Sequence, residues 1–232
     1  SAQVVPTFFP RKFLMEHFTS ENCNECPEGM IAIKDFLALQ STPYIWVSHH
    51  AIYGTDEYTI PEGNKIAQTF SIYSVPTVML NRTNQPDNIA IGTSRLENLN
   101  VIGDTLAEAS VVINHTFNAA TRKLDITISG QVANTEVEQY LLSILIKENR
   151  LVGLQADSYS SYKYATWQEY MHSRVVRDFV TATFGDTVKI TNQTYTYSTN
   201  YTVNSDWVAE NCCVVAYLTP LDKRPIINAE QV

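Results

Sequence analysis

The first third of the chain alternates between short apolar runs and segments with helical spacing. Phe13 to Phe18 and Tyr44 to Ser48 are apolar runs bounded by polar residues, which is typical of buried strands. Residues 62–73 predict a short helix, and the apolar run that opens at Pro76 predicts a third strand. A longer helix is predicted between the first two strands, because four apolar residues recur there at helical spacing: Met30, Ile31, Ile33 and Leu37.

Residues 81–110 predict the end of this first unit. A polar turn from Asn81 leads to a strand at Ile89 to Gly92, which forms a hairpin with the strand before it. Residues 94–109 predict a closing amphipathic helix, marked by Leu96, Leu99, Ile102, Leu106 and Ala109. The expected order is strand, helix, strand, helix, strand, strand, helix, and it is complete near residue 110.

Beyond residue 110 the apolar positions alternate with period two. The clearest alternation is in Val111 to Phe117 and Lys123 to Ser129. Short strands without convincing helices between them are typical of an antiparallel sandwich of immunoglobulin or fibronectin type. We therefore expect an α/β domain over 1–110 and an all-β domain over 111–232, with further strands at Tyr140 to Lys147, Thr187 to Thr191 and Cys213 to Leu218.

Composition excludes several function classes. With 17% charged and 44% apolar residues the chain is globular, and no run approaches the roughly 20 apolar residues of a spanning helix. A net charge of −8 argues against nucleic acid as a partner, because phosphate binding needs clustered Lys and Arg. Abundant Tyr, Thr, Asn and Ser with few Lys are common in exported β-rich proteins.

Cys23 and Cys26 form a C-x-x-C motif where the first strand meets the first helix, and Pro27 suits the first position of that helix. Unpaired N–H groups and the helix dipole favour a thiolate at such a place. In thiol–disulfide exchange Cys23 would be the nucleophile and Cys26 the resolving thiol. A permanent disulfide that fixes the helix start, or half of a zinc site, remain alternatives.

The charges around this motif oppose a strongly oxidising pair. Glu21, Glu25 and Glu28 crowd the two cysteines, and carboxylates raise the pKa of a nearby thiol while the helix terminus lowers it. We expect a thiol pKa of about 7 or above, well above the value of about 3.5 found in the strongest oxidants.

The segment Ser74-Val75-Pro76-Thr77, together with the order of elements around the C-x-x-C motif, resembles the thioredoxin family. The resemblance implies that Pro76 follows a cis bond and lies beside the cysteines, facing partner protein thiols or disulfides, without cofactor or metal. His17 stands where thioredoxins place a buried acid beside the resolving cysteine. It could shuttle a proton there, or it could be a packed histidine bonded to backbone. Asn22 departs from the family, which usually has tryptophan before the first cysteine.

Other polar residues are weaker candidates. His49, His50 and Asp56 could be read as a metal cluster, but adjacent residues of a strand point to opposite faces, so we expect no metal site. His172, with Arg174 and Arg177 close by, could belong to a site at the domain junction or to a structural segment. Cys212 and Cys213 are expected to be buried free thiols, one facing the core.

Four segments of the chain look like those of a Bacteroidetes surface-lipoprotein family of the Omp-twenty-eight type. They are residues 16–23, residues 169–180, Phe184-Gly185 and residues 211–217. The resemblance implies export, a lipid anchor through a cysteine upstream of Ser1, and an outer-membrane, cell-surface location without a spanning helix. Two functions stay open. The chain could be a thiol–disulfide oxidoreductase, or a non-catalytic adhesion protein for a surface ligand in which Cys23–Cys26 is a structural disulfide.

Overall fold

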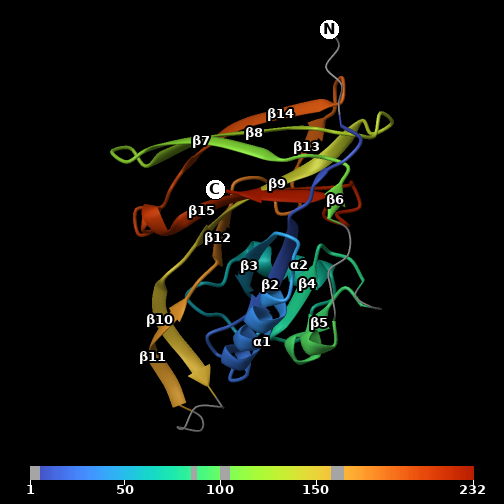
Figure 1. The fold of residues 1–232 in the computed structure, drawn as a ribbon. Helices are drawn as coiled ribbons and strands as arrows, with labels where there is room; N and C mark the ends of the chain where they lie inside the picture. Colours follow the sequence, from blue (N-terminus) through green and yellow to red (C-terminus); the bar gives the residue numbers. More distant parts are fainter. Residues whose placement is uncertain (1–5, 85–87, 100–104, 158–164) are drawn as a thin grey trace.

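The computed structural model describes residues 6–84, 88–99, 105–157 and 165–232. In these residues the chain is mostly β-sheet with few helices. Figure 1 shows both α-helices packed against the strands of the first part, at the bottom of the view, and a layer of long strands across the top.

The first part begins as the apolar pattern predicts. β2 pairs with β3 in parallel and with β4 in the antiparallel sense, and β4 pairs with β5. The predicted order of elements is confirmed as far as β5. The elements are β2 Phe13–Thr19, α1 Cys26–Ala38, β3 Tyr44–His50, α2 Pro61–Thr69, β4 Thr77–Leu80 and β5 Ile91–Gly92.

The predicted closing helix over 94–109 is wrong. The chain forms a short 3₁₀ helix, η1 (Thr93–Asn98), and later a two-residue strand, β6 (Leu106–Ala107), paired with β1 (Phe9–Pro10); residues 100–104 lie outside the described residues. Leu96 packs in the core under α1, whereas Ala109 packs in a different core with β8 and β9. The apolar positions therefore serve two cores, and one continuous helix cannot place them in both.

The second part contains all five of the predicted strands and several that the pattern missed. β14, with sequence TYTYSTNYT, alternates tyrosine with small polar residues and so lacks an aliphatic signal. The strands are β7 Val112–Asn118, β8 Lys123–Gln131, β9 Gln139–Glu148, β10 Leu151–Asp157, β11 Ala165–His172, β12 Val175–Phe179, β13 Asp186–Lys189, β14 Thr194–Thr202, β15 Cys212–Thr219 and β16 Asn228–Gln231, with the 3₁₀ helix η2 Ala209–Asn211 before β15.

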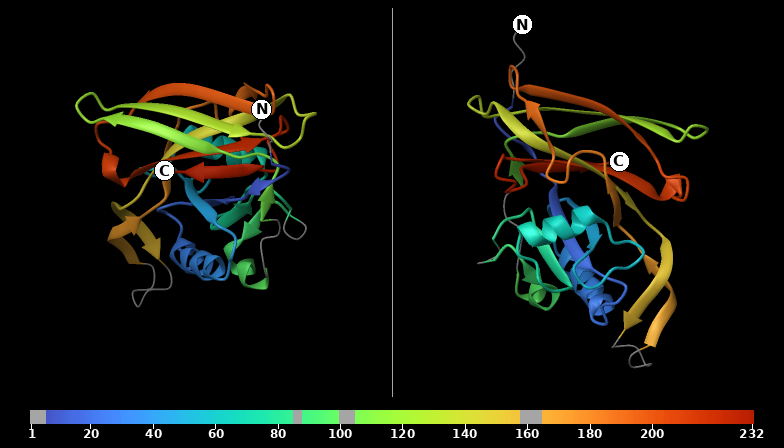
Figure 2. Two further views of the ribbon diagram at one scale, coloured as in Figure 1. Left: turned by 45° about the horizontal axis from the view of Figure 1, so that its top comes forward. Right: turned by 180° about the vertical axis from the view of Figure 1, so that it is seen from behind.

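A single sheet runs through both parts of the chain. Its strand order is β16-β15-β9-β12-β3-β2-β4-β5, with β13 also on β9. β12 makes the connection, because Val175 pairs with Glu148 of β9 on one side and with Ser48 of β3 on the other. A three-stranded sheet, β14-β8-β7, packs over the end of this sheet that β9 and β15 form, and β10 and β11 make a separate hairpin (Figure 2).

The cores also cross residue 110. The core beneath the three-stranded sheet is built from the second part together with Ala109, whereas a second core combines Phe18 and Val47 with Leu145, Val215 and Tyr217. The boundary near residue 110 stays a prediction. The shared sheet and shared core, however, change what we expect of the two segments when they are separated.

Candidate functional site

Cys23 and Cys26 form a disulfide at the start of α1. The turn before the helix is closed by backbone hydrogen bonds from Cys23 N to Ser20 O (3.2 Å) and from Cys26 N to Cys23 O (3.3 Å). Both cysteine residues are 3% exposed. In the disulfide-bonded form neither cysteine is more accessible than the other.

The β10–β11 hairpin lies over the turn that carries the disulfide. Gln155 Nε2 donates to Cys23 O at 2.9 Å, and Ala156 N donates to Glu21 O at 2.8 Å. Gly153 allows this close approach, since a Cβ atom there would lie 2.7 Å from Tyr58 Oη and 2.8 Å from a carboxylate oxygen of Glu21. A hairpin from the second part of the chain thus helps to bury the disulfide of the first.

Pro76 lies against the same helix. The Val75–Pro76 bond is cis, as predicted. A Cβ atom on Gly29 would lie 2.6 Å from Pro76 Cγ, so α1 can approach Pro76 this closely only because residue 29 is glycine. The two segments border a groove of about 310 Å³ whose lining includes Pro76, Thr93, Glu25 and Glu28. Because Glu25 and Glu28 both line this groove, it suits a neutral or basic segment better than an acidic one.

His17 is fully buried on β2. Its Nδ1 is 3.2 Å from Ser48 Oγ on β3, and its Nε2 has no hydrogen-bond partner among the described residues. Burial, with the nearby His50, His49 and Arg174, lowers the pKa of His17 to about 3. His17 is therefore neutral at ordinary pH.

His50 and Asp56 form a buried pair near the disulfide, whereas His49 lies elsewhere. His50 Nδ1 is 2.9 Å from Asp56 Oδ2. His49 stacks between Phe18 and Phe179. The two histidines do not converge, and no three residues of the described segments are placed to hold a metal ion.

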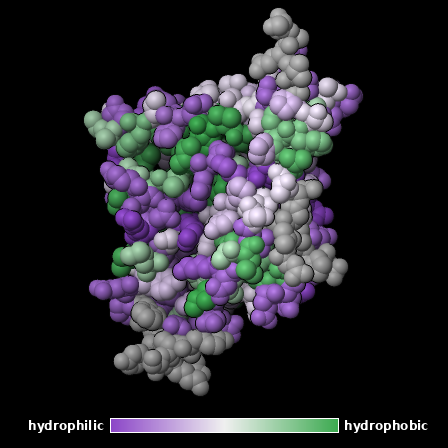
Figure 3. Space-filling model, in the orientation of Figure 1, coloured by the Kyte–Doolittle hydropathy of each residue, from purple (hydrophilic) through white to green (hydrophobic). Residues whose placement is uncertain are grey.

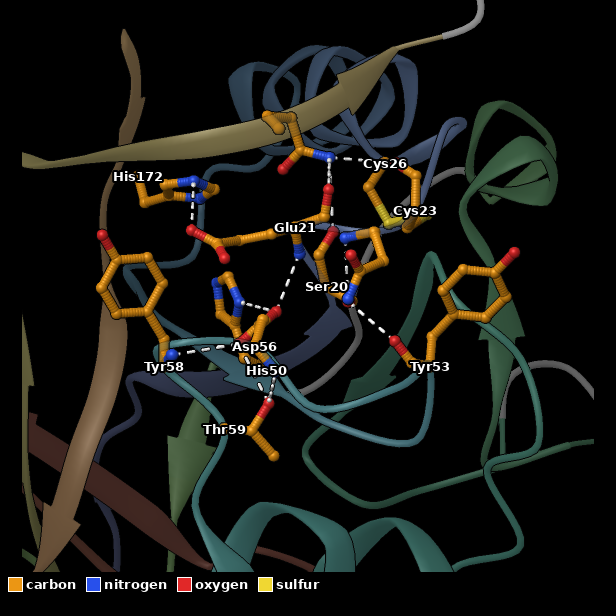
Figure 4. Close-up of polar contacts among 12 residues, drawn as sticks. Ser20, Glu21, Cys23, Cys26, His50, Tyr53, Asp56, Tyr58, Thr59 and His172 are labelled. Carbon is orange, nitrogen blue, oxygen red and sulfur yellow. Dashed lines mark hydrogen bonds and ion pairs between the residues drawn. A yellow bond between two sulfur atoms is a disulfide. The ribbon is translucent and has the colours of Figure 1, made fainter. Parts of the chain in front are cut away.

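A cavity of about 10 Å³ lies between the disulfide and this pair. Cys26, His50 and His172 all line it (Figure 4). His172 Nε2 is 2.8 Å from Leu154 O, and burial lowers the pKa of His172 to about 4. The sequence suggested a junction role for His172 but gave no signal for Gln155 or Tyr170, the other residues of the hairpin at this cavity. Their strands were not predicted.

Cys212 and Cys213 are free thiols at the start of β15, as expected, but both are half-buried. Burial raises the pKa of Cys212 to about 12, with Glu148 adding to the effect. Both cysteines line an apolar cavity of about 300 Å³ with Phe117, Leu124 and Val214. Figure 3 shows hydrophobic side chains gathered on the upper part of this face, between the three-stranded sheet and β15.

The fold and the site define a mostly β protein that carries a buried disulfide at the start of a helix. Residues 63–232 match the family model of outer membrane protein Omp28, and the chain belongs to this family. The protein is therefore an outer membrane protein of the cell envelope. The matched segment begins after Cys26, so the family match does not include the disulfide.

Two solved structures show the same fold. HBP35 of Porphyromonas gingivalis is 19% identical, with a TM-score of 0.77 over 97% of this chain and 75% of that one. A protein of Agrobacterium tumefaciens is 13% identical, with a TM-score of 0.52 over 100% of this chain and 96% of that one. A domain of the outer membrane lipoprotein Omp28 from Porphyromonas gingivalis has a TM-score of only 0.33. No curated protein sequence matches the chain.

Neither α1 nor α2, the α-helices of the described segments, is long and apolar enough to cross a membrane.

Proposed function

We propose that this protein is a lipid-anchored outer-membrane protein that exchanges disulfides with partner proteins through Cys23 and Cys26. Segment β2–β5 would serve as a thioredoxin-like scaffold, and the second part as an immunoglobulin-like support. The observation that carries the proposal is the disulfide at the first turn of α1, with Gly29 and Pro76 in contact one turn further along. Helix N–H groups at such a turn stabilise a thiolate, which is the attacking species in exchange.

The groove beside Pro76 indicates the kind of partner. It is bordered by Glu25 and Glu28 on one side and by the backbone around Val75 on the other. An extended peptide carrying a cysteine can lie in a groove of this kind, and the two carboxylates favour Lys or Arg near that cysteine. We therefore expect exchange with basic peptides to slow as salt screens the attraction.

Trapping and redox measurements test the proposal. Cys26→Ser should hold a mixed disulfide with a partner, whereas Cys23→Ser should hold none. The reduction potential of the pair should lie between roughly −120 and −270 mV, the range of redox-active couples. A potential below about −300 mV with no trapped partner would contradict exchange, because structural disulfides lie there.

A second candidate function is ligand binding without catalysis, with Cys23–Cys26 as a fixed disulfide. Two observations favour it: both cysteines are 3% exposed, and the apolar cavity at Phe117 and Val214 lies far along the chain from them. Its volume of about 300 Å³ is at the lower end for small-molecule sites. A low potential together with saturable binding of a small apolar molecule, lost on Val214→Trp, would favour this function over exchange.

A further inference from the structure

We propose that the Asp56–His50 pair accepts the proton of Cys26 when the reduced cysteines close their disulfide, through one water in the cavity between them. This rests on the proposed exchange function. Cys26, as the resolving thiol, has a different role from Cys23, which attacks the partner and lies just before the start of the helix. Cys26 is covered by its own helical turn and by the hairpin, and burial in apolar surroundings raises the pKa of a thiol. A buried resolving thiol therefore needs a base within reach.

The hydrogen bonds around Asp56 fix which nitrogen of His50 can act as that base. Asp56 accepts from Glu21 N at 2.8 Å, from Tyr58 N at 3.0 Å and from Thr59 Oγ1 at 2.9 Å. Burial alone would raise the pKa of Asp56, but His50 and these donors hold it well below its usual range. An ionised carboxylate can only accept, so His50 Nδ1 must donate, and His50 Nε2 carries the free lone pair.

The cavity connects His50 with Cys26. Both residues line it, and its volume of about 10 Å³ is close to the smallest space that holds one water. Thr19, Ser48 and Gln155 supply further polar groups at its wall, which a buried water requires. One water can therefore relay a proton from Cys26 Sγ to His50 Nε2.

Neither of the other histidines nearby is as well suited. His172 lines the cavity, but a backbone carbonyl is its closest partner, and its pKa of about 4 makes it a weak base. His17 does not line the cavity, and its pKa is about 3. Among these three described histidines, His50 alone has a carboxylate within hydrogen-bond distance, at 2.9 Å, whereas the nearest carboxylate to His172 is Glu21 at 3.8 Å. The titratable groups that face His50 are Asp56 and Tyr58 from its own loop, His17 from β2, Glu21 and Cys26 from the turn and α1, and Tyr170 and His172 from β11.

The step balances as follows. Cys23 is bound to a partner sulfur, and the proton of Cys26 passes through the water to His50 Nε2. The Cys26 thiolate attacks Cys23 Sγ, the bond between Cys23 and the partner sulfur breaks, and that sulfur leaves as a thiolate, which takes up a proton. Two cysteine thiols of this chain are oxidised to a disulfide, and the partner's disulfide is reduced to two thiols.

The closure step can be followed with a chromogenic aromatic disulfide, dithiobisnitrobenzoate. When it is mixed with the reduced protein, attack by Cys23 releases one coloured thiolate and closure by Cys26 releases a second. We expect His50→Gln to slow the second phase by about tenfold or more near neutral pH and to leave the first phase unchanged. The loss should shrink towards about pH 9, where solvent removes the proton unaided. Asp56→Asn should slow closure in the same pH-dependent way and tests the pair if His50→Gln does not fold.

His172→Gln is the matched control, since it alters the same cavity without touching the pair, and it should leave the closure rate within about twofold. Equal losses in His50→Gln and His172→Gln, or a loss that does not vary with pH, would overturn the proposal. So would the absence of a closure phase in the folded wild-type protein. Closure that depends on His50, with no protein partner trapped by Cys26→Ser, would instead remove the exchange function and keep the proton relay.

Discussion

The core beneath the three-stranded sheet and the core around β2 and β3 are stabilised in different ways. Beneath the three-stranded sheet, the buried side chains are aliphatic and aromatic, with Ile126, Ile128 and Ile144 almost fully covered. Around β2 and β3 the interior also holds charged and titratable groups, among them Glu16 and Arg82, each 1% exposed. The first core depends on buried apolar area, whereas the second depends also on its buried charged groups keeping their partners.

The Glu16–Arg82 pair shows what this dependence involves. Arg82 donates to both carboxylate oxygens of Glu16 at 2.8 Å and to Tyr217 Oη at 3.0 Å. Burial alone would raise the pKa of Glu16, but the Arg82 guanidinium lowers it to about 2. Glu16 belongs to β2 and Tyr217 to β15, so this buried network ties the first part of the chain to the second.

Separating the two parts of the chain should destabilise both cores more than any single substitution does. We expect fragments 1–110 and 111–232, expressed apart, to lack a cooperative unfolding transition, because each would expose its share of the mixed core and one edge of the shared sheet. Thermal unfolding followed by circular dichroism measures this, and mixing the fragments should restore part of the transition. A sharp transition in fragment 1–110 alone would show that the mixed core is not required.

The sequence predicted the local elements better than their assembly. Phe13 to Phe18 and Tyr44 to Ser48 have clear apolar signals, and β2 and β3 lie there. Nothing in the alternation of β9 reveals that β12 will join it to β3, because strand order depends on contacts distant in sequence. The β10–β11 hairpin was missed because much of its surface is exposed and its apolar residues form no one-sided stripe.

At the candidate site, too, the sequence predicted local features better than contacts between distant residues. The C-x-x-C motif and Pro76 were found because their spacing and residue types carry the signal locally. His50 and Asp56 were considered only as metal ligands, since a sequence does not show that one carboxylate will gather donors from Glu21, Tyr58 and Thr59. Arg82 was read as part of a polar turn, and its buried partner lies 66 residues earlier in the chain.

Arg82→Met should give the largest effect of a single substitution. It leaves the Glu16 carboxylate buried without its cation, and breaking a buried pair costs about 3–5 kcal/mol of unfolding free energy. Urea denaturation at neutral pH measures the loss. The double variant Glu16→Gln with Arg82→Met should lose less than the two single losses added together, because the uncompensated charge is gone. Additive losses would show that the two groups are not coupled.

Acidification should have the next largest effect, and it should destabilise the core around β2 and β3. The folded protein keeps His17 neutral down to a pKa of about 3, whereas the unfolded chain binds a proton near 6.5. The unfolded state therefore binds more protons below about pH 6.5, and stability falls as pH falls. Between about pH 6.5 and pH 5 this residue alone accounts for up to about 2 kcal/mol. Unfolding free energies of His17→Gln should vary less steeply with pH, while His115→Gln, exposed on β7, should follow the wild type.

A single methylene removed from the aliphatic core should give the smallest effect. Ile144 is fully buried on β9, and its neighbours in this core include Leu142, Ile146 and Val214. Ile144→Val should cost about 1 kcal/mol of unfolding free energy, from lost apolar burial and a small residual cavity. No charge is removed and no polar partner is left unpaired, so the cost should be the same at about pH 7 and pH 5, where the His17 effect has changed. A cost that grew on acidification would mean that the two cores are energetically coupled, and that the aliphatic core is stabilised in part through the charged network at β2 and β15.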